Sequence, residues 1–437
     1  MGVARAFRVT RPSTPPGRGA PGEPRVLPEP RVLPEPRATT DVSHHSKPGV
    51  PSKPGDAPST RTELAVWLGL VIALVGLMQT GTPPGAAVLA LIVVALTLAV
   101  SLRWHIGWAA VIVLLAVGIT LRLVTTGGFS DVLIVNEAAI REMLAGANPY
   151  GHGFEESVPP GAPFAYGPVA LLWYLPSLDD PGRMELLASL VVLGALAVRG
   201  RPLGLAIYAV TPALVVAATD GSNDTTAGLL ILIALLAAVR WPIAGAVLLA
   251  LATAFKPYAL AWLPGLLAYA GGAAPLAAFV IASAIAWLPA LLAWGPDSLL
   301  WSFRRADELH AQPYYSLAFG VGNPEGVPKG VWQAIRVGVG VLLAVTSFVT
   351  VRSSTSLIIV GALIFGATLF LGWWSTFAYF AAAAPIICWH LDDWLGLGSR
   401  RVVWPGDPVR AVTTWVDTRW PVRHPGQDVM DPSPVGR

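Results

Sequence analysis

The chain has 437 residues, of which 54% are hydrophobic and 13% are charged, and its formal net charge is +3 at pH 7. Its charged share is about half that of a soluble domain, so composition excludes an ordinary soluble protein and indicates a polytopic membrane protein. The single cysteine, Cys388, excludes an internal disulfide, a cysteine-rich zinc site and a redox CxxC pair. Of the 29 Lys and Arg residues, ten lie in residues 1–62 and six in residues 396–437. This bias indicates membrane topology rather than a nucleic-acid-binding patch.

The two ends of the chain are polar. Residues 1–62 are rich in Pro, Arg, Ser and Thr and contain the tandem stretch EPRVLPEPRVLPEPR, so we expect a disordered cytosolic tail. No apolar core follows Met1, so we expect no cleavable signal peptide. Residues 396–437 are again polar and Pro-rich and are predicted to be a second cytosolic tail. Residues 63–395 are the predicted transmembrane domain.

Apolar stretches fill residues 63–395, most of them near the roughly 20 residues that a helix needs to cross the hydrocarbon of a bilayer. They are continuous and do not alternate with a period of two, so they predict helices rather than strands. We therefore expect an all-α, polytopic transmembrane helical bundle with about 11–13 membrane helices. Several stretches are short and bounded by proline, which indicates an internal site, because other protein or a cavity must then satisfy the backbone groups. The expected spans are 64–81, 85–102, 105–124, 164–178, 183–198, 203–219, 225–240, 242–255, 257–271, 275–294, 331–350, 355–372 and 375–391.

Basic residues predict the orientation of these spans. The basic N-terminal tail is expected in the cytosol, which places the loop at 81–85 and the segment at 127–151 outside. Counting back from the basic C-terminal tail places 372–376 and the loop at 295–330 outside as well. The expected location is a bacterial-type cell membrane, crossed several times, with a cytosolic N-terminus and an extracytoplasmic site.

The membrane crossings counted from the N-terminus and those counted from the C-terminus give conflicting orientations between residues 164 and 198. Arg199 and Arg201 favour the cytosol, yet two full crossings before them would put them outside. One of those two segments is therefore predicted to be re-entrant or partly interfacial. With this correction, the stretch 220–224 and Lys256 also fall on the outer face.

Two segments are predicted to be helices along the outer membrane interface. Residues 130–146 have Ser130 as the expected N-cap, Gly146 as the stop, and one polar face that includes Asp131. Residues 301–315, WSFRRADELHAQPYY, are the second segment. Charges at membrane depth cost about 2.5–3.5 kcal/mol on insertion scales, so those that persist often serve function. Asp131 also has a structural explanation, since the dipole of any helix stabilises an acid in the first turn.

Two stretches that follow Asp131 carry a family resemblance. LAGANPYG (144–151) and FAYGPVALLWYLP (164–176), after an Asp at the exit of an early membrane helix, resemble the polyprenyl-phosphate-dependent glycosyltransferases of the GT-C class. The closest resemblance is to glycosyltransferase family 87, with its mannosyltransferase- and arabinofuranosyltransferase-like members. It runs loosely over residues 64–391.

Three later stretches fit the same resemblance: TDGSNDTTAGLL (219–230), FKPYALAWLP (255–264) and the aromatic GWWSTFAYF. The sequence departs from the family pattern in two places. Gly167 replaces the first Pro of a Tyr-Pro-Pro turn, and Asp220 and Ser222 blur a Gly-Gln-x-Asn pattern. These departures bear on sugar and acceptor specificity more than on the fold.

The resemblance implies a GT-C-type domain over residues 63–395. Its implied activity is transfer of a hexosyl or pentosyl unit from a polyprenyl-phosphate sugar to a cell-envelope glycan or glycolipid acceptor. Mannose is the favoured sugar. Asp131 is the implied general base of a direct inverting displacement without a covalent intermediate. His310 is the second candidate catalytic residue, as a proton carrier or phosphate donor. The expected partners are the lipid bilayer, the donor and the acceptor, and no nucleic acid. We expect no cofactor and no metal-ligand cluster. The sequence does not decide whether a divalent ion is needed or what the oligomeric state is.

The candidate binding residues each have a structural alternative. Lys256, Arg304 and Arg305 are the candidates for donor-phosphate binding, but Lys256 also fits a snorkelling lysine and the arginines fit headgroup contacts. Arg122 fits a phosphate partner or an interfacial anchor. Helix capping explains Asn223 or Asp224 equally well, and Tyr and Trp are common interfacial anchors. The candidates for sugar or acceptor binding are Asn148, Tyr150, Tyr166, Asn223, Asp224, Trp373 and Trp374.

A secondary transporter or a flippase for lipid-linked sugars is the main alternative function. Transporters typically show two related halves with ionisable groups near the midplane, whereas this sequence shows no internal duplication and gathers its charges at one face. A non-catalytic scaffold of an envelope assembly is a third possibility. The enzyme hypothesis requires that Asp131, Lys256 and His310 line one outward cavity with lateral access for a prenyl chain.

Overall fold

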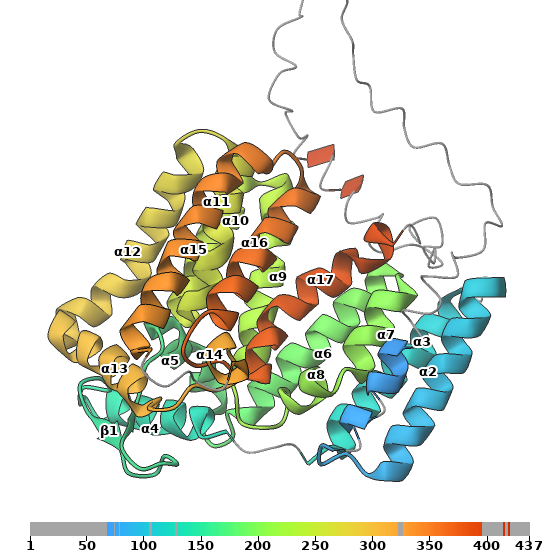
Figure 1. Ribbon diagram of the computed structural model, residues 1–437, viewed down its shortest axis with the longest axis horizontal. Coiled ribbons are helices and arrows are strands. Elements are labelled where there is room, and N and C mark those ends of the chain that lie inside the picture. Colours follow the sequence, from blue (N-terminus) through green and yellow to red (C-terminus); the bar gives the residue numbers. More distant parts are fainter. Residues whose placement is uncertain are drawn as a thin grey trace, which may run out of the picture. The chain divides into compact units, whose positions relative to one another are not determined.

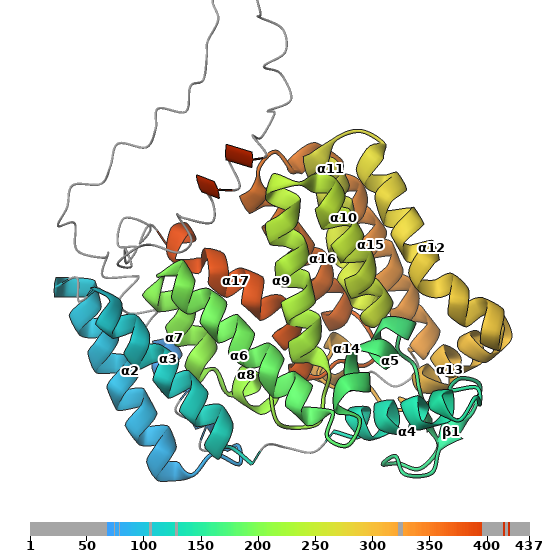
Figure 2. The same ribbon diagram turned by 180° about the vertical axis from the view of Figure 1, so that it is seen from behind.

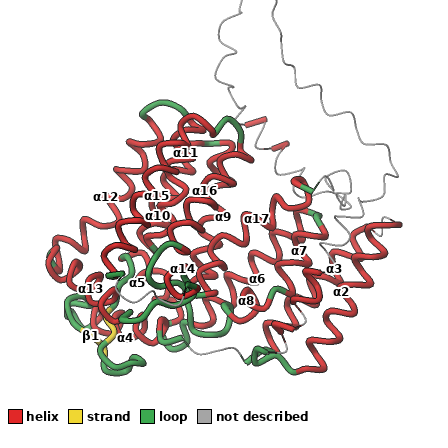
Figure 3. The backbone as a smooth tube through the Cα atoms, viewed as in Figure 1, coloured by secondary structure: helices red, strands yellow, loops and turns green. Residues whose placement is uncertain are grey.

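The computed structural model describes residues 68–73, 75–77, 79–104, 107–126, 130–321, 327–395, 414–415 and 418–419. The predicted tails, 1–62 and 396–437, lie outside the described residues apart from four positions in the second tail. The described chain is almost entirely helical (Figures 1 and 3). Its one sheet within those ranges is a short antiparallel pair, β1 (Gly153–Phe154) with β2 (Ala162–Pro163).

Proline sets the start of many helices. Six of them, α2, α5, α7, α8, α10 and α13, have proline as their first residue. Proline suits this position because its φ is preset and the missing N–H would have no partner within the helix. The helices are α2 (Pro84–Trp104), α3 (Gly107–Val124), α4 (Val132–Leu144), α5 (Pro168–Tyr174), α6 (Gly182–Arg199), α7 (Pro202–Val210), α8 (Pro212–Val216), α9 (Asp224–Arg240), α10 (Pro242–Phe255), α11 (Leu263–Ala270), α12 (Ala274–Trp294), α13 (Pro296–Leu309), α14 (Leu317–Gly320), α15 (Lys329–Thr350), α16 (Ser354–Phe370) and α17 (Phe380–Trp394), with 3₁₀ turns η1 (Leu175–Ser177), η2 (Pro257–Trp262) and η3 (Phe377–Tyr379).

Four of the described helices, α2, α3, α12 and α15, are long and apolar enough to cross a membrane. The segment Pro168–Ser177 together with α6 makes a fifth if the two count as one span. The predicted span 64–81 lies partly outside the described residues. The other predicted spans are shorter or broken, as where Thr211 separates α7 from α8. The structure therefore shows an all-α protein with several candidate membrane helices. The described helices that are long enough to cross a membrane are fewer than the 11–13 predicted.

One irregular region agrees with the sequence prediction, and two boundaries differ from it. The chain bends by 96° between Pro168–Ser177 and α6, in the region where a re-entrant or interfacial segment was predicted. The N-cap of α4 is Asp131 rather than Ser130, and the Asp131 side chain makes no capping hydrogen bond. The second interfacial helix, α13, begins at Pro296 and ends before His310, because proline and glycine start a new helix directly after α12.

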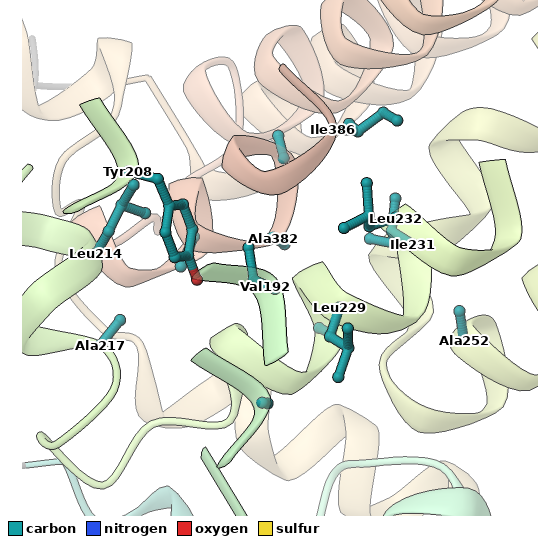
Figure 4. Packing of buried hydrophobic residues seen from close by; sticks show 14 of the residues in the cluster. Val192, Tyr208, Leu214, Ala217, Leu229, Ile231, Leu232, Ala252, Ala382 and Ile386 are labelled. Carbon is teal, nitrogen blue, oxygen red and sulfur yellow. The ribbon is translucent and has the colours of Figure 1, made fainter. Parts of the chain in front are cut away.

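Helix α9 lies at the centre of the described bundle, between α6, α10 and α17 (Figure 2). Figure 4 shows Val192 of α6, Leu229 and Leu232 of α9, and Ile386 of α17 in this core. Small residues allow the helices to approach closely, which matters in lipid because helices there gain no hydrophobic driving force from each other. A side chain at Gly228 of α9 would overlap the carbonyl of Ala381 in α17.

Helix α7 is capped at both ends by buried charges from other helices. The carboxylate of Asp392 in α17 accepts hydrogen bonds from the N–H groups of Leu203 and Gly204, at 3.1 and 2.8 Å. At the other end, the guanidinium of Arg122 in α3 donates to the carbonyls of Tyr208 and Ala209, at 3.0 and 3.2 Å. Each charge complements the helix dipole and satisfies groups that the helix end leaves unpaired. Arg122 is therefore a structural residue, 1% exposed, and neither an interfacial anchor nor a phosphate partner.

Several short elements gather at one end of this bundle. Helices α4, α13 and α5 and strand β1 lie together toward the lower edge of Figure 1, and the same grouping is seen from behind in Figure 2. Helices α6 and α9 begin near this edge and run away from it, so their last residues, Arg199 and Arg240, lie toward the opposite end. The outer faces of α12 and α15 carry many exposed apolar side chains, such as Leu292 and Val349. Such faces suit contact with lipid.

Candidate functional site

A cavity of about 470 Å³ lies at this end of the bundle, between the start of α4, the end of α13 and the stretch that precedes α17. Its wall combines charged, aromatic and apolar groups from segments far apart in the sequence. The polar and aromatic lining residues are Ser130, Asp131, Tyr166, Asp220, Ser222, Asp224, Lys256, His310, Tyr314, Trp374, Thr376, Phe377 and Tyr379.

The structure brings together half of the predicted site residues. Asp131 and His310, the two candidate catalytic residues, and Lys256, a candidate for phosphate binding, all line this cavity, and so do Tyr166, Asp224 and Trp374. Six others do not line it: Arg304, Arg305, Asn148, Tyr150, Asn223 and Trp373.

Asp131 presents a half-buried carboxylate to the cavity. Asp131 is the N-cap residue of α4, where the helix dipole favours an acid, but its side chain makes no capping hydrogen bond. Burial raises the pKa of Asp131 above the ordinary value for aspartate, and hydrogen bonding with the backbone of Asp131 and Val158 offsets only part of this shift. A carboxylate with a raised pKa is a stronger base than an exposed one.

The loop before α9 fixes the position of Asp131. The N–H of Ser130 donates to the carbonyl of Asp220 at 2.6 Å, and the N–H of Leu133 donates to the carbonyl of Gly221 at 2.9 Å. Gly221 has a φ of +86°, which side-chain-bearing residues rarely adopt. A Cβ at Gly221 would also overlap the carbonyl of Ser130. The glycine is thus required both for its own conformation and for the close approach of the two segments.

Asp224 and Lys256 form a buried ion pair in the cavity wall. The ammonium nitrogen of Lys256 lies 2.6 Å from Asp224 Oδ1 and 2.6 Å from Asn223 Oδ1, and the two charged side chains are 2% and 7% exposed. The hydroxyl of Tyr258 donates to the same oxygen of Asp224. Lys256 is therefore not a snorkelling lysine at the membrane surface.

Three tyrosines surround the ammonium group of Lys256. Its nitrogen lies 5.6, 5.0 and 5.1 Å from the ring centres of Tyr166, Tyr258 and Tyr379. These distances are typical of cation–π contacts, which hold a desolvated cation in place. Tyr166 and Tyr379 also line the cavity, so aromatic faces stand beside the ion pair.

Gly167 explains one departure from the family pattern. Its N–H donates to the carbonyl of Phe255 at 3.3 Å, which a proline at this position could not do. A Cβ at Gly167 would overlap the carbonyl of Ala254. This contact joins the residue after Tyr166 to the residue before Lys256, and so places the tyrosine ring next to the ammonium group.

His310 belongs to an aromatic stack on the other side of the cavity. Its ring lies 4.3 Å from the ring of Trp374, nearly parallel, and Trp374 lies 4.8 Å from Tyr314 in turn. Burial lowers the pKa of His310 below the ordinary value for histidine, and the charge of Lys329 adds to this effect. His310 is therefore mainly neutral at pH 7 and offers one donor and one acceptor rather than a positive charge.

Asn148 and Tyr150 hold the segment after α4 to the rest of the fold. Asn148 Nδ2 donates to Ser298 Oγ at 3.0 Å, and Asn148 Oδ1 accepts from the N–H of Tyr150 at 2.9 Å. The hydroxyl of Tyr150 donates to the carbonyl of Tyr166 at 3.1 Å, and its ring packs against Trp294. These contacts give both residues a structural role outside the cavity.

Trp373 and the two arginines of α13 lie outside the cavity. Trp373 is buried against Ala318 and Trp332, and its ring N–H donates to the carbonyl of His310 at 2.9 Å. Arg304 is exposed, and Arg305 pairs with Glu308 at the surface of α13. The arginines thus lie in the helix that His310 caps, but they do not reach the cavity wall.

Four aromatic side chains with exposed faces adjoin the cavity. Tyr314 and Phe377 line it, while Tyr315 and Phe319 pack against them, and their exposed fractions range from 39% to 52%. Exposed apolar groups in such a cluster mark a site for an apolar partner. We call these four residues the aromatic rim.

Sequence reasoning missed Asp220 and Tyr379 as cavity residues. Both lie in stretches that the resemblance had singled out, TDGSND and FAYF, but no local pattern shows that their side chains reach one cavity. Burial raises the pKa of Asp220 above the ordinary value. Among the described residues, no group of three or more His, Cys, Asp or Glu side chains is arranged to hold a metal ion.

Comparisons with protein-family models, curated proteins and solved structures find no match to this chain. What the described residues define is an all-α protein with candidate membrane helices and a charged, aromatic-lined cavity at one end.

Proposed function

We propose that this chain is a GT-C-type membrane glycosyltransferase similar to those of glycosyltransferase family 87. It transfers a hexosyl or pentosyl unit, mannose first, from a polyprenyl-phosphate sugar to a cell-envelope glycan or glycolipid. The observation that carries the proposal is that Asp131, Lys256 and His310 line one cavity, although they come from three separate parts of the chain. The enzyme hypothesis required this grouping, together with an outward face and lateral access for a prenyl chain, which stay predictions.

Asp131 is the general base. The acceptor hydroxyl attacks the anomeric carbon of the sugar, Asp131 takes the hydroxyl proton, and the bond from the anomeric carbon to the phosphate oxygen breaks with inversion. The electron pair of that bond leaves with the polyprenyl phosphate. A half-buried carboxylate with a raised pKa suits this role, because it accepts a proton more readily than an exposed aspartate.

The aromatic rim and α13 supply the donor side of the reaction. The rim gives an exposed apolar surface beside the cavity, which suits the prenyl chain of a lipid-linked donor. Helix α13 contributes Leu309 and its C-cap His310 to the cavity and carries Arg304 and Arg305 on its surface. The arginines suit approach of the anionic lipid headgroup.

The extracytoplasmic face is proposed from the basic residues. Arg199 ends α6, Arg240 ends α9 and Arg352 lies between α15 and α16, all at helix ends that lead away from the cavity. Basic residues favour the cytosolic side of membrane proteins. The cavity then faces outward in a bacterial-type cell membrane, and the N-terminal tail is cytosolic.

The direct test is sugar transfer by membranes that contain the protein. Membranes are incubated with radiolabelled polyprenyl-phosphate mannose or arabinofuranose, and label in envelope glycans and glycolipids is counted. Asp131→Asn should lower transfer by about 10²–10⁴-fold, since it removes the base. The matched control is Glu137→Gln, which removes an acid of the same helix that pairs with Arg141 and does not line the cavity.

The outcomes separate the alternatives. Equal transfer by Asp131→Asn and the unchanged protein would remove Asp131 as the base. No transfer from any donor would contradict the glycosyltransferase proposal and favour a transporter or flippase, which movement of a fluorescent lipid-linked sugar across vesicles would then detect.

A further inference from the structure

Lys256 was predicted from the sequence to bind the donor phosphate, but its charge is already neutralised. The ammonium nitrogen lies 2.6 Å from Asp224 Oδ1, inside the wall, where both side chains are nearly inaccessible to solvent. At that separation the two charges act on a ligand as a dipole, because the carboxylate repels an approaching phosphate nearly as strongly as the ammonium attracts it. The same cavity wall carries two further carboxylates, Asp131 and Asp220. An anionic phosphate is therefore not the natural ligand of this pair.

The pair instead offers unused hydrogen-bonding capacity. Both the Lys256 ammonium and the Tyr258 hydroxyl bind Oδ1 of Asp224, which leaves Oδ2 able to accept. An ammonium group has three donors, of which Asn223 and Asp224 take two. Asn223 is fully buried, and its Nδ2 group has no hydrogen-bond partner within the described part of the chain. Asn223 lies directly between two residues that line the cavity, Ser222 and Asp224.

This combination matches the hydroxyl groups of a sugar. A hydroxyl donates one hydrogen bond and accepts others, so neighbouring hydroxyls can donate to Asp224 Oδ2 and accept from Lys256. Tyr166 and Tyr379, which line the cavity on the same side, offer flat apolar faces for the C–H groups of a sugar ring. A phosphate accepts only, and could not use the free carboxylate oxygen.

We infer that Asp224 and Lys256, with Asn223 buried beside them, form the subsite that binds hydroxyl groups of the transferred sugar. The inference rests on the proposed function and reassigns Lys256 from the phosphate to the sugar. Within that function, Asp131 acts at the attacking hydroxyl while this subsite selects the sugar. The arginines of α13 keep their role in the approach of the anionic headgroup outside the cavity.

Asp224→Asn separates the two roles of the pair. Asparagine keeps Oδ1 for Lys256 and Tyr258, but it replaces the accepting Oδ2 by a donor and leaves the lysine charge uncompensated. Binding to the full-length protein in nanodiscs is measured for a short-chain polyprenyl phosphate, and for the same phosphate carrying mannose or arabinofuranose. The variant should bind the sugar-bearing ligand about tenfold or more weakly, because a hydrogen bond to a charged group is lost. It should bind the sugarless phosphate as well as or better than the unchanged protein.

The matched control is Asp220→Asn, which removes one negative charge from the same cavity and keeps the Asp224–Lys256 pair. It should change the binding of both ligands by the same factor. If the thermal midpoint shows that Asp224→Asn does not fold, Tyr379→Leu provides the second variant, with several-fold weaker binding of the sugar-bearing ligand only.

Tighter binding of both ligands by Asp224→Asn would overturn the inference and return Lys256 to the phosphate, while the proposed function stands. A sugar-bearing ligand that binds the unchanged protein no better than the sugarless phosphate would overturn it as well. If neither ligand binds the unchanged protein at all, the proposed function itself fails.

Discussion

The N–H of Ser130 donates a 2.6 Å hydrogen bond to the carbonyl oxygen of Asp220. This contact joins the residue before the candidate base to the loop that leads into Asn223 and Asp224. Together with the bond from Leu133 to Gly221, it ties Asp131 to the loop that leads into the buried ion pair. The two proposed functions of the cavity, proton transfer and sugar recognition, therefore depend on a single backbone junction.

Gly221→Ala should disturb this junction. The new Cβ would overlap the carbonyl of Ser130, and alanine would also have to adopt a φ of +86°. Forcing this backbone costs on the order of 1–3 kcal/mol, and a displacement of about 1 Å in the base can lower turnover by about 10²-fold. Sugar transfer and the thermal midpoint of the purified protein measure the two effects.

Gly271→Ala is the control for this substitution. Gly271, between α11 and α12, also has a positive φ, +64°, but nothing lies near the position of its Cβ. The control should lose a comparable amount of backbone stability and keep full transfer activity. Equal loss of activity in both variants would show that the junction with Ser130 has no special role.

The pH dependence of transfer should show an acid limb that belongs to Asp131. A general base acts only when it is ionised, so activity falls as the pH drops through its pKa. Burial raises the pKa of Asp131, and the limb should therefore lie at higher pH than for an exposed aspartate. The pKa of His310 is lowered, so this residue is already neutral across the upper part of the range. His310→Asn should leave the midpoint of the limb in place, whereas a midpoint that moves with this variant would assign the limb to His310.

The class of fold follows from composition, but the interior of the bundle does not. Continuous apolar stretches predicted helices, and most of the predicted spans coincide with a helix. The prediction treated each stretch as one crossing, however, while the chain breaks several of them at proline, as between α7 and α8. Such breaks depend on partners from distant segments, such as Arg122 and Asp392 at the ends of α7. A hydropathy pattern contains no information about those partners.

The candidate site, like the fold, was predicted only in part from the sequence. Asp131, Lys256 and His310 were predicted from polarity and family resemblance, and all three line one cavity. The motif that carried most of the resemblance, ANPYG, contributes structural contacts through Asn148 and Tyr150 instead. A motif marks residues that a fold needs, and it does not tell a ligand contact from a structural hydrogen bond.

Asn148→Ala should accordingly weaken the fold rather than the site. The change removes the bonds to Ser298 Oγ and to the N–H of Tyr150, and leaves those groups partly unpaired. The expected loss is about 1–3 kcal/mol of stability, with the KM for the donor unchanged in the fraction that stays folded. Thermal unfolding in detergent and transfer at limiting donor check the two parts. A raised KM at normal stability would place Asn148 in the binding site after all.

The adjacent pair Trp373 and Trp374 gives a sharper contrast, because the two side chains occupy different surroundings. Trp374 stacks with His310 and Tyr314, but it is only partly buried and lines the cavity, so the accessible part of its ring can contact a substrate. Trp374→Ala should raise the KM for the donor several-fold, in line with about 0.5–1.5 kcal/mol for an aromatic contact, with a small change in thermal midpoint. Trp374→Phe should restore most of the affinity because it keeps a stacking face.

Trp373→Ala should have the opposite profile. Its indole is 6% exposed, packs with Ala318 and Trp332, and donates to the carbonyl of His310. Truncating a buried tryptophan leaves a cavity and costs about 3–5 kcal/mol. The thermal midpoint should fall steeply, and Trp373→Phe should recover only part of it because phenylalanine lacks the indole donor. If Trp374→Ala instead changed stability alone, the aromatic stack would be part of the scaffold rather than a surface for the substrate. If Trp373→Ala changed the KM alone, Trp373 would belong to the binding site.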